Sequence, residues 1–251
     1  MTLRFAIGVL TRNVLSTDRR RLLRLTVERL LSAFPEAPLF LLDNGSDDGS
    51  GAYIEDAYRP RERVRVTLRC NEDGNSTPGR GNNVLISWML SDARDAEVHV
   101  KSDDDVLWRE DAGELLTRIW SAPHGVDGWR EEIAIVGGYL EPEWRWNTPR
   151  ETVFPGGVPV LIRDSTPSGA WTYRATPPGA LARQRERWRS GGSPPLKEQF
   201  GADHAYCCEL REAGLLVAQA DLAEHLGAGR SSLGSEVMGG ARPLDRKKWR
   251  I

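Results

Sequence analysis

The sequence predicts an α/β protein with a mixed, mostly parallel sheet and helices on both faces. Short, almost wholly apolar runs at 5–10 and 39–42 are typical of strands buried on both sides, and the stretch between them carries a helical apolar stripe. Strand, helix and strand in this order form a βαβ unit with a right-handed crossover. Nine of the fifteen prolines lie between residues 141 and 196, so an irregular second half is expected.

The helix after the first strand has start and stop signals. Ser16 or Thr17 can cap it, and Asp18 then lies in its first turn, where a negative charge is favourable. Pro35 closes the helix. The apolar positions fall on one face, which predicts the side that packs on the sheet: Leu23, Val27, Leu30, Leu31 and Phe34.

The other elements follow in order. Residues 63–68 alternate, which predicts a less buried strand near an edge of the sheet. A glycine-rich turn at 79–83 is expected to lead into a helix at 84–90. The remaining expected elements are strands at 97–102, 133–136, 158–162, 170–173 and 215–218, and helices at 111–121 and 203–213.

The composition argues against several partners and locations. A net charge of −2 gives no electrostatic reason to expect a nucleic-acid or membrane partner. No apolar run reaches the roughly 20 residues of a membrane span, and the apolar run near the N-terminus is too short for a signal peptide. The three cysteines lack zinc spacing and are expected to be reduced thiols in a cytoplasmic protein.

Three consecutive carboxylates, Asp103, Asp104 and Asp105, follow the strand expected at 97–102. Adjacent like charges repel one another and disfavour a packed interior. A divalent cation at the mouth of the sheet would neutralise them, whereas the alternative is a solvated acidic turn.

Polar residues also follow the two earlier strands. Thr11, Arg12 and Asn13 end the first strand, and the polar loop Asp43 to Ser46 ends the second. Ligands of open α/β sheets bind outside the carboxyl ends of the strands. Together with Arg80 for a phosphate, these groups suit a metal-bound nucleoside diphosphate.

These segments resemble a known family. The chain is similar to GT-A-fold (Rossmann-like) glycosyltransferases, close to the large family-two-type inverting nucleotide-sugar transferases. Residues 11–13 match the family's Thr-Tyr-Asn-like triplet, and 43–50 match Asp-Asn-Gly-Ser-Thr-Asp-Gly-Ser with one difference. Asn71 with 79–83 loosely matches the family's loop Asn and Gly-x-x-x-Asn, and 103–105 match its Asp-x-Asp (DXD) motif.

The resemblance continues in the second half. Residues 201–214 match a family run ending in Arg-Glu-Ala-Gly without a gap, and Asp203 falls at the position of the expected base. The departures from this run are Ala202, Ala205 and Glu209. Residues 179–188 resemble the segment lining the donor sugar, and 224–231 resemble a His-x-Gly element whose histidine, here His225, is often a metal ligand.

The resemblance implies a metal-dependent transferase that uses a nucleotide sugar, with inversion expected. Asp105 and His225, helped by Asp103, would bind Mn²⁺ or Mg²⁺. Asp203 would remove the proton from the acceptor hydroxyl as a general base; a simple helix cap is the competing role. The implied nucleotide-sugar-binding residues are Thr11, Arg12, Asn13, Asp43, Asn44, Ser46, Asn71, Arg80, Asp103, Asp104, Gly179 and Ala180.

The resemblance also implies an organisation of the chain. Residues 1–230 would form one GT-A domain, with a nucleotide-binding half at 1–106 and an irregular acceptor-binding half at 107–230. The basic tail at 231–251 is expected to be mobile. His99 and His124 are expected to be structural. Three tryptophans of the second half would either stack on a sugar or fill a small core: Trp144, Trp146 and Trp171.

Other functions remain open on the sequence. A binding protein of the same fold that has lost catalysis is one alternative, because the run at 201–214 departs from the family at three positions. A sugar nucleotidyltransferase is less favoured, since residues 4–16 lack a glycine-rich triphosphate loop with a lysine. A UDP-sugar is the favoured donor. The acceptor is unknown; a saccharide is favoured over nucleic acid, although 183–189 and the tail are basic.

Overall fold

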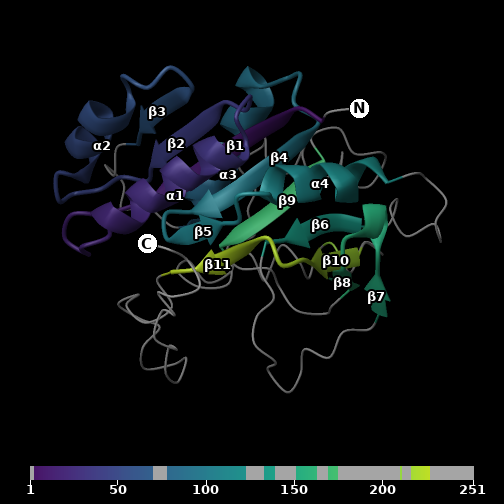
Figure 1. Cartoon of the computed structure of the whole chain (residues 1–251). Helices are drawn as coiled ribbons and strands as arrows, with labels where there is room; N and C mark the ends of the chain where they lie inside the picture. Colours follow the sequence, from purple (N-terminus) through teal and green to yellow (C-terminus); the bar gives the residue numbers. More distant parts are fainter. Residues whose placement is uncertain are drawn as a thin grey trace.

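Figure 1 shows a computed structural model of the chain. The structure describes residues 3–69, 78–122, 133–138, 151–162, 169–174, 210 and 216–226.

Within these ranges, nine strands form one mixed sheet in the order β3-β2-β1-β4-β9-β6-β10-β8-β7 (Figure 1). The strands β3, β2, β1 and β4 are parallel neighbours, β6 and β10 form a further parallel pair, and the other pairs are antiparallel. The predicted α/β class is therefore confirmed, and β3 lies at an edge as expected. The strands are β1 (Phe5–Thr11), β2 (Leu39–Asp43), β3 (Val64–Leu68), β4 (Val98–Asp103), β6 (Ile133–Gly137), β7 (Glu151–Val153), β8 (Val160–Ile162), β9 (Ala170–Arg174) and β10 (Leu216–Gln219).

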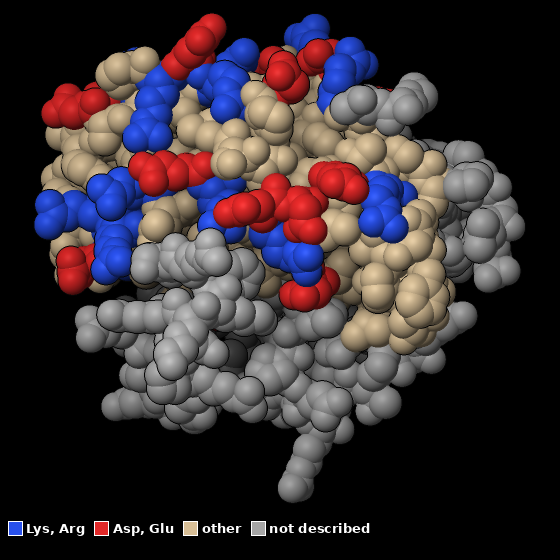
Figure 2. All heavy atoms as spheres, in the orientation of Figure 1, with Lys and Arg blue, Asp and Glu red and all other residues tan. Residues whose placement is uncertain are grey.

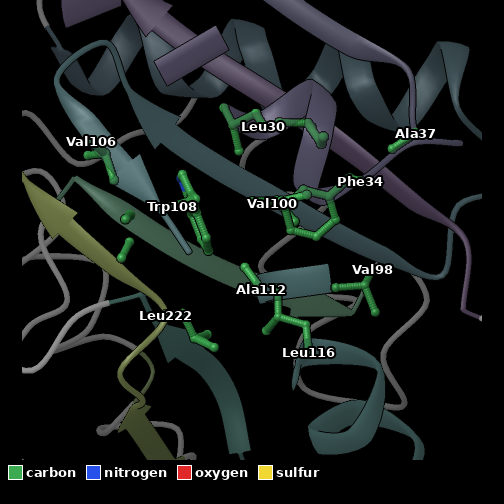
Figure 3. Close-up of a cluster of buried hydrophobic side chains, with 14 of the residues drawn as sticks. Leu30, Phe34, Ala37, Val98, Val100, Val106, Trp108, Ala112, Leu116 and Leu222 are labelled. Carbon is green, nitrogen blue, oxygen red and sulfur yellow. The ribbon is translucent and has the colours of Figure 1, made fainter. Parts of the chain in front are cut away.

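Helices cover both faces of the sheet. The described helices are α1 (Arg20–Ala33), α2 (Ser50–Tyr58), α3 (Pro78–Asp92), α4 (Ala112–Ser121) and the short 3₁₀ helix η1 (Pro155–Gly157). One face packs against α1, α2 and α4. Figure 3 shows part of this cluster, with the side chains of Leu30, Val100, Trp108 and Leu116 among those labelled. The other face packs against α3.

The alternation of strand side chains explains the two cores. Ile7 and Val9 of β1 point to the α1 side, whereas Ala6 and Leu10 point to the α3 side. Gly8 also faces α3, where a Cβ atom would lie 2.9 Å from side-chain atoms of Leu85 and Met89. Its missing side chain lets α3 approach the strand closely.

The expected start of the first helix is wrong. The helix α1 begins at Arg20, and its N-cap position, Arg19, makes no side-chain capping bond. Ser16 and Thr17 instead lie in a turn before the helix, and Asp18 has a positive φ of 53°. The turn is held from outside, because the Ser16 N–H donates to Asp48 at 2.7 Å.

The expected glycine turn at 79–83 is also wrong, since the chain is helical from Pro78. Gly81 lies against Asn44 and Leu10, where a Cβ atom would come within 2.8 Å of either side chain. The glycine therefore serves close packing of a helix rather than a turn. The structure also contains five elements that were not expected: α2, β7, η1, and the antiparallel pair of β5 (Val106–Trp108) with β11 (Ala223–His225).

The surface carries both signs of charge. Figure 2 shows Lys and Arg side chains interspersed with Asp and Glu over the described part of one face. No helix among the described residues is long and apolar enough to cross a membrane.

Candidate nucleotide and metal site

The carboxyl ends of three parallel strands meet at one edge of the sheet. Thr11 pairs with Asp43 in the β1–β2 register, and Leu10 pairs with Asp103 in the β1–β4 register. The polar residues that follow β1, β2 and β4 are thus neighbours, as the sequence predicted. This edge is where an open α/β sheet binds its ligand.

The loops after β1 and β2 are bonded to each other. The Asn13 backbone N–H donates to Ser46 Oγ at 2.8 Å, and its side chain exchanges bonds of 2.9 and 3.2 Å with Asp47. Asn13 adopts a positive φ of 54°, a conformation that asparagine tolerates better than most residues. Arg12, Asn13 and Ser46, all predicted to bind nucleotide, therefore belong to one connected structure.

Asp43 is buried at the end of β2, with 2% of its surface exposed. Its carboxylate accepts bonds from the Ser46 hydroxyl and, at 3.1 Å, from the Ser46 N–H. Burial raises the pKa of Asp43, and the two bonds from Ser46 oppose the rise. The loop thus holds a buried acceptor beside the strand ends.

Each aspartate of the triplet faces a different basic side chain. Asp103 Oδ1 lies 2.6 Å from Lys101 Nζ, Asp104 Oδ1 lies 2.6 Å from Arg19 Nη1, and Asp105 Oδ1 lies 3.4 Å from His225 Nε2. The three carboxylates are therefore not equivalent.

Asp104 is directed inward. Its side chain is 2% exposed, and its Oδ2 accepts a 2.5 Å bond from the Thr11 hydroxyl. Burial raises the pKa of Asp104 to about 7, although the Arg19 guanidinium opposes the shift. Arg19 also donates to the Arg12 carbonyl at 2.7 Å. Asp104 thereby connects the triplet to the loop after β1.

Asp105 and His225 meet although 120 positions separate them in the sequence. The β5–β11 pair brings them together: His225 pairs with Val106, and the Leu226 N–H donates to the Asp105 carbonyl at 2.7 Å. Burial raises the pKa of Asp105, and the adjacent His225 opposes the rise. The family resemblance implied this pair, helped by Asp103, as metal ligands.

The described residues contain no group of three or more His, Cys, Asp or Glu side chains placed to hold a metal ion. The donor set at this point is one carboxylate and one imidazole. Such a pair fits a divalent cation only if further ligands come from outside the described protein atoms, as when Mg²⁺ is held by one or two carboxylates and substrate phosphates.

Arg69 lies beside the site and was missed by the sequence analysis. It follows β3 directly, its N–H donates to the Asp43 carbonyl, and its Nη1 donates to Asn44 Oδ1 at 2.6 Å. Burial lowers the pKa of Arg69, and the positive charge of Arg80 lowers it further. Its position directly after an expected strand was the signal that could have identified it.

Several predicted residues lie outside the described ranges: Asn71, Trp144, Trp146, Gly179, Ala180 and Asp203. The basic tail lies outside them as well. Trp171 is 2% exposed and packs against Tyr173 in the core. His99 is also buried and bonds to the Tyr173 hydroxyl at 2.9 Å, which confirms its structural role.

Comparison with known proteins identifies fold relatives only. No protein-family model and no curated protein matches this chain. Among solved structures, S. aureus TarS 1-349 is 13% identical with a TM-score of 0.57, covering 91% of this chain and 62% of that one. S. aureus TarS matches at 13% identity, TM-score 0.53, with 88% and 37% covered. S. aureus TarS 1-349 in complex with UDP matches at 15% identity, TM-score 0.55, with 87% and 58% covered.

The similarity extends over most of this chain, which spans less than two thirds of TarS 1-349. At these identities it shows a shared fold.

Proposed function

We propose that the chain is a glycosyltransferase that moves a sugar from a nucleoside-diphosphate sugar to an acceptor hydroxyl. The fold it shares with TarS supports this, because TarS 1-349 has been crystallised with UDP. A UDP-sugar is therefore the favoured donor.

The observation that carries the proposal is the meeting of Asp105 and His225 at the edge where β1, β2 and β4 end. The pair would hold Mn²⁺ or Mg²⁺ together with diphosphate oxygens and water. A bound cation there would stabilise the charge that develops on the leaving nucleoside diphosphate.

The protein groups around it have separate tasks. Asp43 and the loop after β1 would hold the base, and Asp103, whose side chain is 37% exposed, would accept a bond from the ribose. Arg80 would bind the diphosphate. Asp203 would take the proton of the acceptor hydroxyl as that oxygen attacks the anomeric carbon, which leads to inversion.

Calorimetric titration with UDP, GDP and TDP, with and without Mn²⁺, tests the donor site. We expect UDP to bind most tightly and Mn²⁺ to strengthen its binding. Asp105→Asn should remove most of the Mn²⁺ effect. Asp95→Asn is the matched control, because Asp95 is an exposed aspartate paired with Arg4. A chain that binds none of these nucleotides would contradict the proposal.

The role of the base has its own test. Asp203→Asn should reduce transfer and slow hydrolysis of a UDP-sugar by at least ~100-fold, as for loss of a general base, and leave the Kd for UDP nearly unchanged. Wild-type turnover in this variant would remove Asp203 from the mechanism. A wild-type chain that binds UDP but turns over no sugar nucleotide would instead identify an inactive binding protein.

A further inference from the structure

Lys101 is a buried lysine in the middle of the sheet. It belongs to β4, two residues before Asp103, and its side chain is 1% exposed. Lysine is among the residues least often buried, because removing an ammonium from water is costly unless it is paired. Its place in the core therefore requires an explanation.

Asp103 and Trp171 are described neighbours that stabilise the ammonium. Lys101 Nζ donates to Asp103 Oδ1 at 2.6 Å, a distance typical of a charge-assisted bond. The same atom lies 5.9 Å from the centroid of the Trp171 ring, since β4 and β9 pair Lys101 with Trp171. The lysine is thus held on one side by an aromatic face while its charge points along the strand towards the triplet.

The three aspartates of the triplet are not equally neutralised by the basic side chains that face them. With all three carboxylates ionised, Lys101 and Arg19 supply two fixed positive charges at 2.6 Å from Asp103 and Asp104. Among its described ion-pair partners, Asp105 faces only the His225 imidazole. The negative charge left for a cation is therefore concentrated at Asp105.

We propose that Lys101 is a positioning residue for the donor site: it fixes the Asp103 carboxylate for the ribose and keeps the divalent cation at Asp105 and His225. The inference rests on the proposed function. It assigns Lys101 two measurable effects of opposite sign. Its charge holds Asp103 and so raises the affinity for UDP, and the same charge repels the cation and so lowers the affinity for Mn²⁺.

Lys101→Met removes the charge and keeps an unbranched apolar stem. We expect the affinity of the nucleotide-free protein for Mn²⁺ to rise on the order of tenfold, as one unit charge near a dication produces in a partly hydrated site. Free Mn²⁺ is measured by electron paramagnetic resonance. In EDTA, the affinity for UDP should fall by roughly tenfold, because Asp103 loses a charge-assisted bond.

Two variants serve as controls. Lys101→Arg keeps the positive charge and should therefore leave the Mn²⁺ affinity within about twofold of the wild type. Arg65→Met also removes a cationic side chain beside an aromatic ring and a carboxylate. Arg65 Cζ lies 5.1 Å from the Phe40 ring centroid, and Arg65 Nη1 lies 3.7 Å from Asp92 Oδ2. Arg65 is on β3, three strands from β4, or roughly 14 Å at ordinary strand spacing. It should change neither affinity.

A double-mutant cycle tests whether Lys101 acts through Asp103. Asp103→Asn should weaken UDP binding by itself, and adding Lys101→Met should then cause no further loss. Additive losses in the folded double variant would contradict the positioning role.

Circular dichroism shows whether the Lys101→Met protein is folded. If it is folded and binds Mn²⁺ no more tightly than the wild type, the proposal is overturned. If this variant does not fold, Lys101→Gln takes its place with the same expected rise and the same contradicting result. If the wild-type chain binds Mn²⁺ and UDP and the Lys101 variants bind both with the same affinities, only the role of Lys101 is refuted. A wild-type chain that binds neither refutes the proposed function as well.

Discussion

Arg69 connects three elements at the edge of the site. It lies at the end of β3, bonds the Asp43 carbonyl through its N–H, and holds the side chain of Asn44, which is 2% exposed. Asn44 in turn contacts α3, because a Cβ atom on Gly81 would come within 2.8 Å of it. One guanidinium thus fixes a buried amide between β2 and α3 and adds a positive charge near Arg80.

Arg69→Gln should therefore weaken UDP binding by roughly five- to tenfold, the effect of losing one charge-assisted bond. The expected loss is in affinity for UDP, and uridine should lose less because it has no diphosphate. Calorimetry with both ligands measures the difference. Arg65→Gln, on the same strand but paired with Asp92, is the control. An equal loss of UDP affinity in Arg69→Gln and Arg65→Gln would contradict a specific role for Arg69 and indicate a general effect of positive charge.

At the scale of elements, the loops after β1 and β2 act as one unit. Asp48 joins them: one of its oxygens accepts from the Ser16 N–H at 2.7 Å, and the other accepts from Ser50 N, the first residue of α2, at 3.0 Å. Burial alone would raise the pKa of Asp48. The bonds from Ser50 and Ser16 outweigh it, so the pKa lies well below its ordinary value.

A lowered pKa means that the ionised carboxylate stabilises the folded chain. This contribution is present above the unfolded pKa, near 4, and is lost as the pH falls through the folded value. Asp48→Asn should lower the free energy of unfolding by about 1 kcal/mol at pH 7, because the N–H groups of Ser16 and Ser50 lose a charged acceptor. Urea unfolding at pH 7 and pH 3 measures it. A difference between wild type and variant that does not shrink at low pH would contradict this account.

The elements also show what local sequence can predict. The strands β1 and β2 were predictable because burial on both faces leaves continuous apolar runs. The helix α2 was missed because only Ser50, Ile54 and Tyr58 are buried in it, too few for a clear stripe. The start of α3 was misjudged because Gly81 has a packing role that only its distant neighbours Asn44 and Leu10 reveal.

The candidate site likewise has residues that could be predicted from the sequence and contacts that could not. Thr11, Asp43 and Asp103 were predictable, since strand ends are visible in the sequence and parallel strands end at one edge. The partners of the triplet were harder to predict from the residues alone. Arg19 lies 85 positions from Asp104, and a pairing over such a distance follows from topology rather than from local pattern.

At the scale of the molecule, the proposed cation site would join the two halves of the chain. Asp105 follows β4, the last in the chain of the four neighbouring parallel strands. His225 lies on β11, which comes after β7 to β10 in the sequence. The predicted boundary between a nucleotide-binding half ending at 106 and an acceptor half stays a prediction. If both halves contribute ligands, binding at this point should stabilise the whole fold rather than one half.

Thermal unfolding tests this coupling. Because the described part of the protein supplies only a carboxylate and an imidazole, the cation should bind weakly alone and tightly with a diphosphate. A ligand that binds the native state raises Tm according to its concentration and Kd. We therefore expect UDP with Mn²⁺ to raise Tm by more than the sum of the two separate shifts, and His225→Ala to abolish the excess. A full shift with Mn²⁺ alone would mean that the chain holds the cation without the nucleotide.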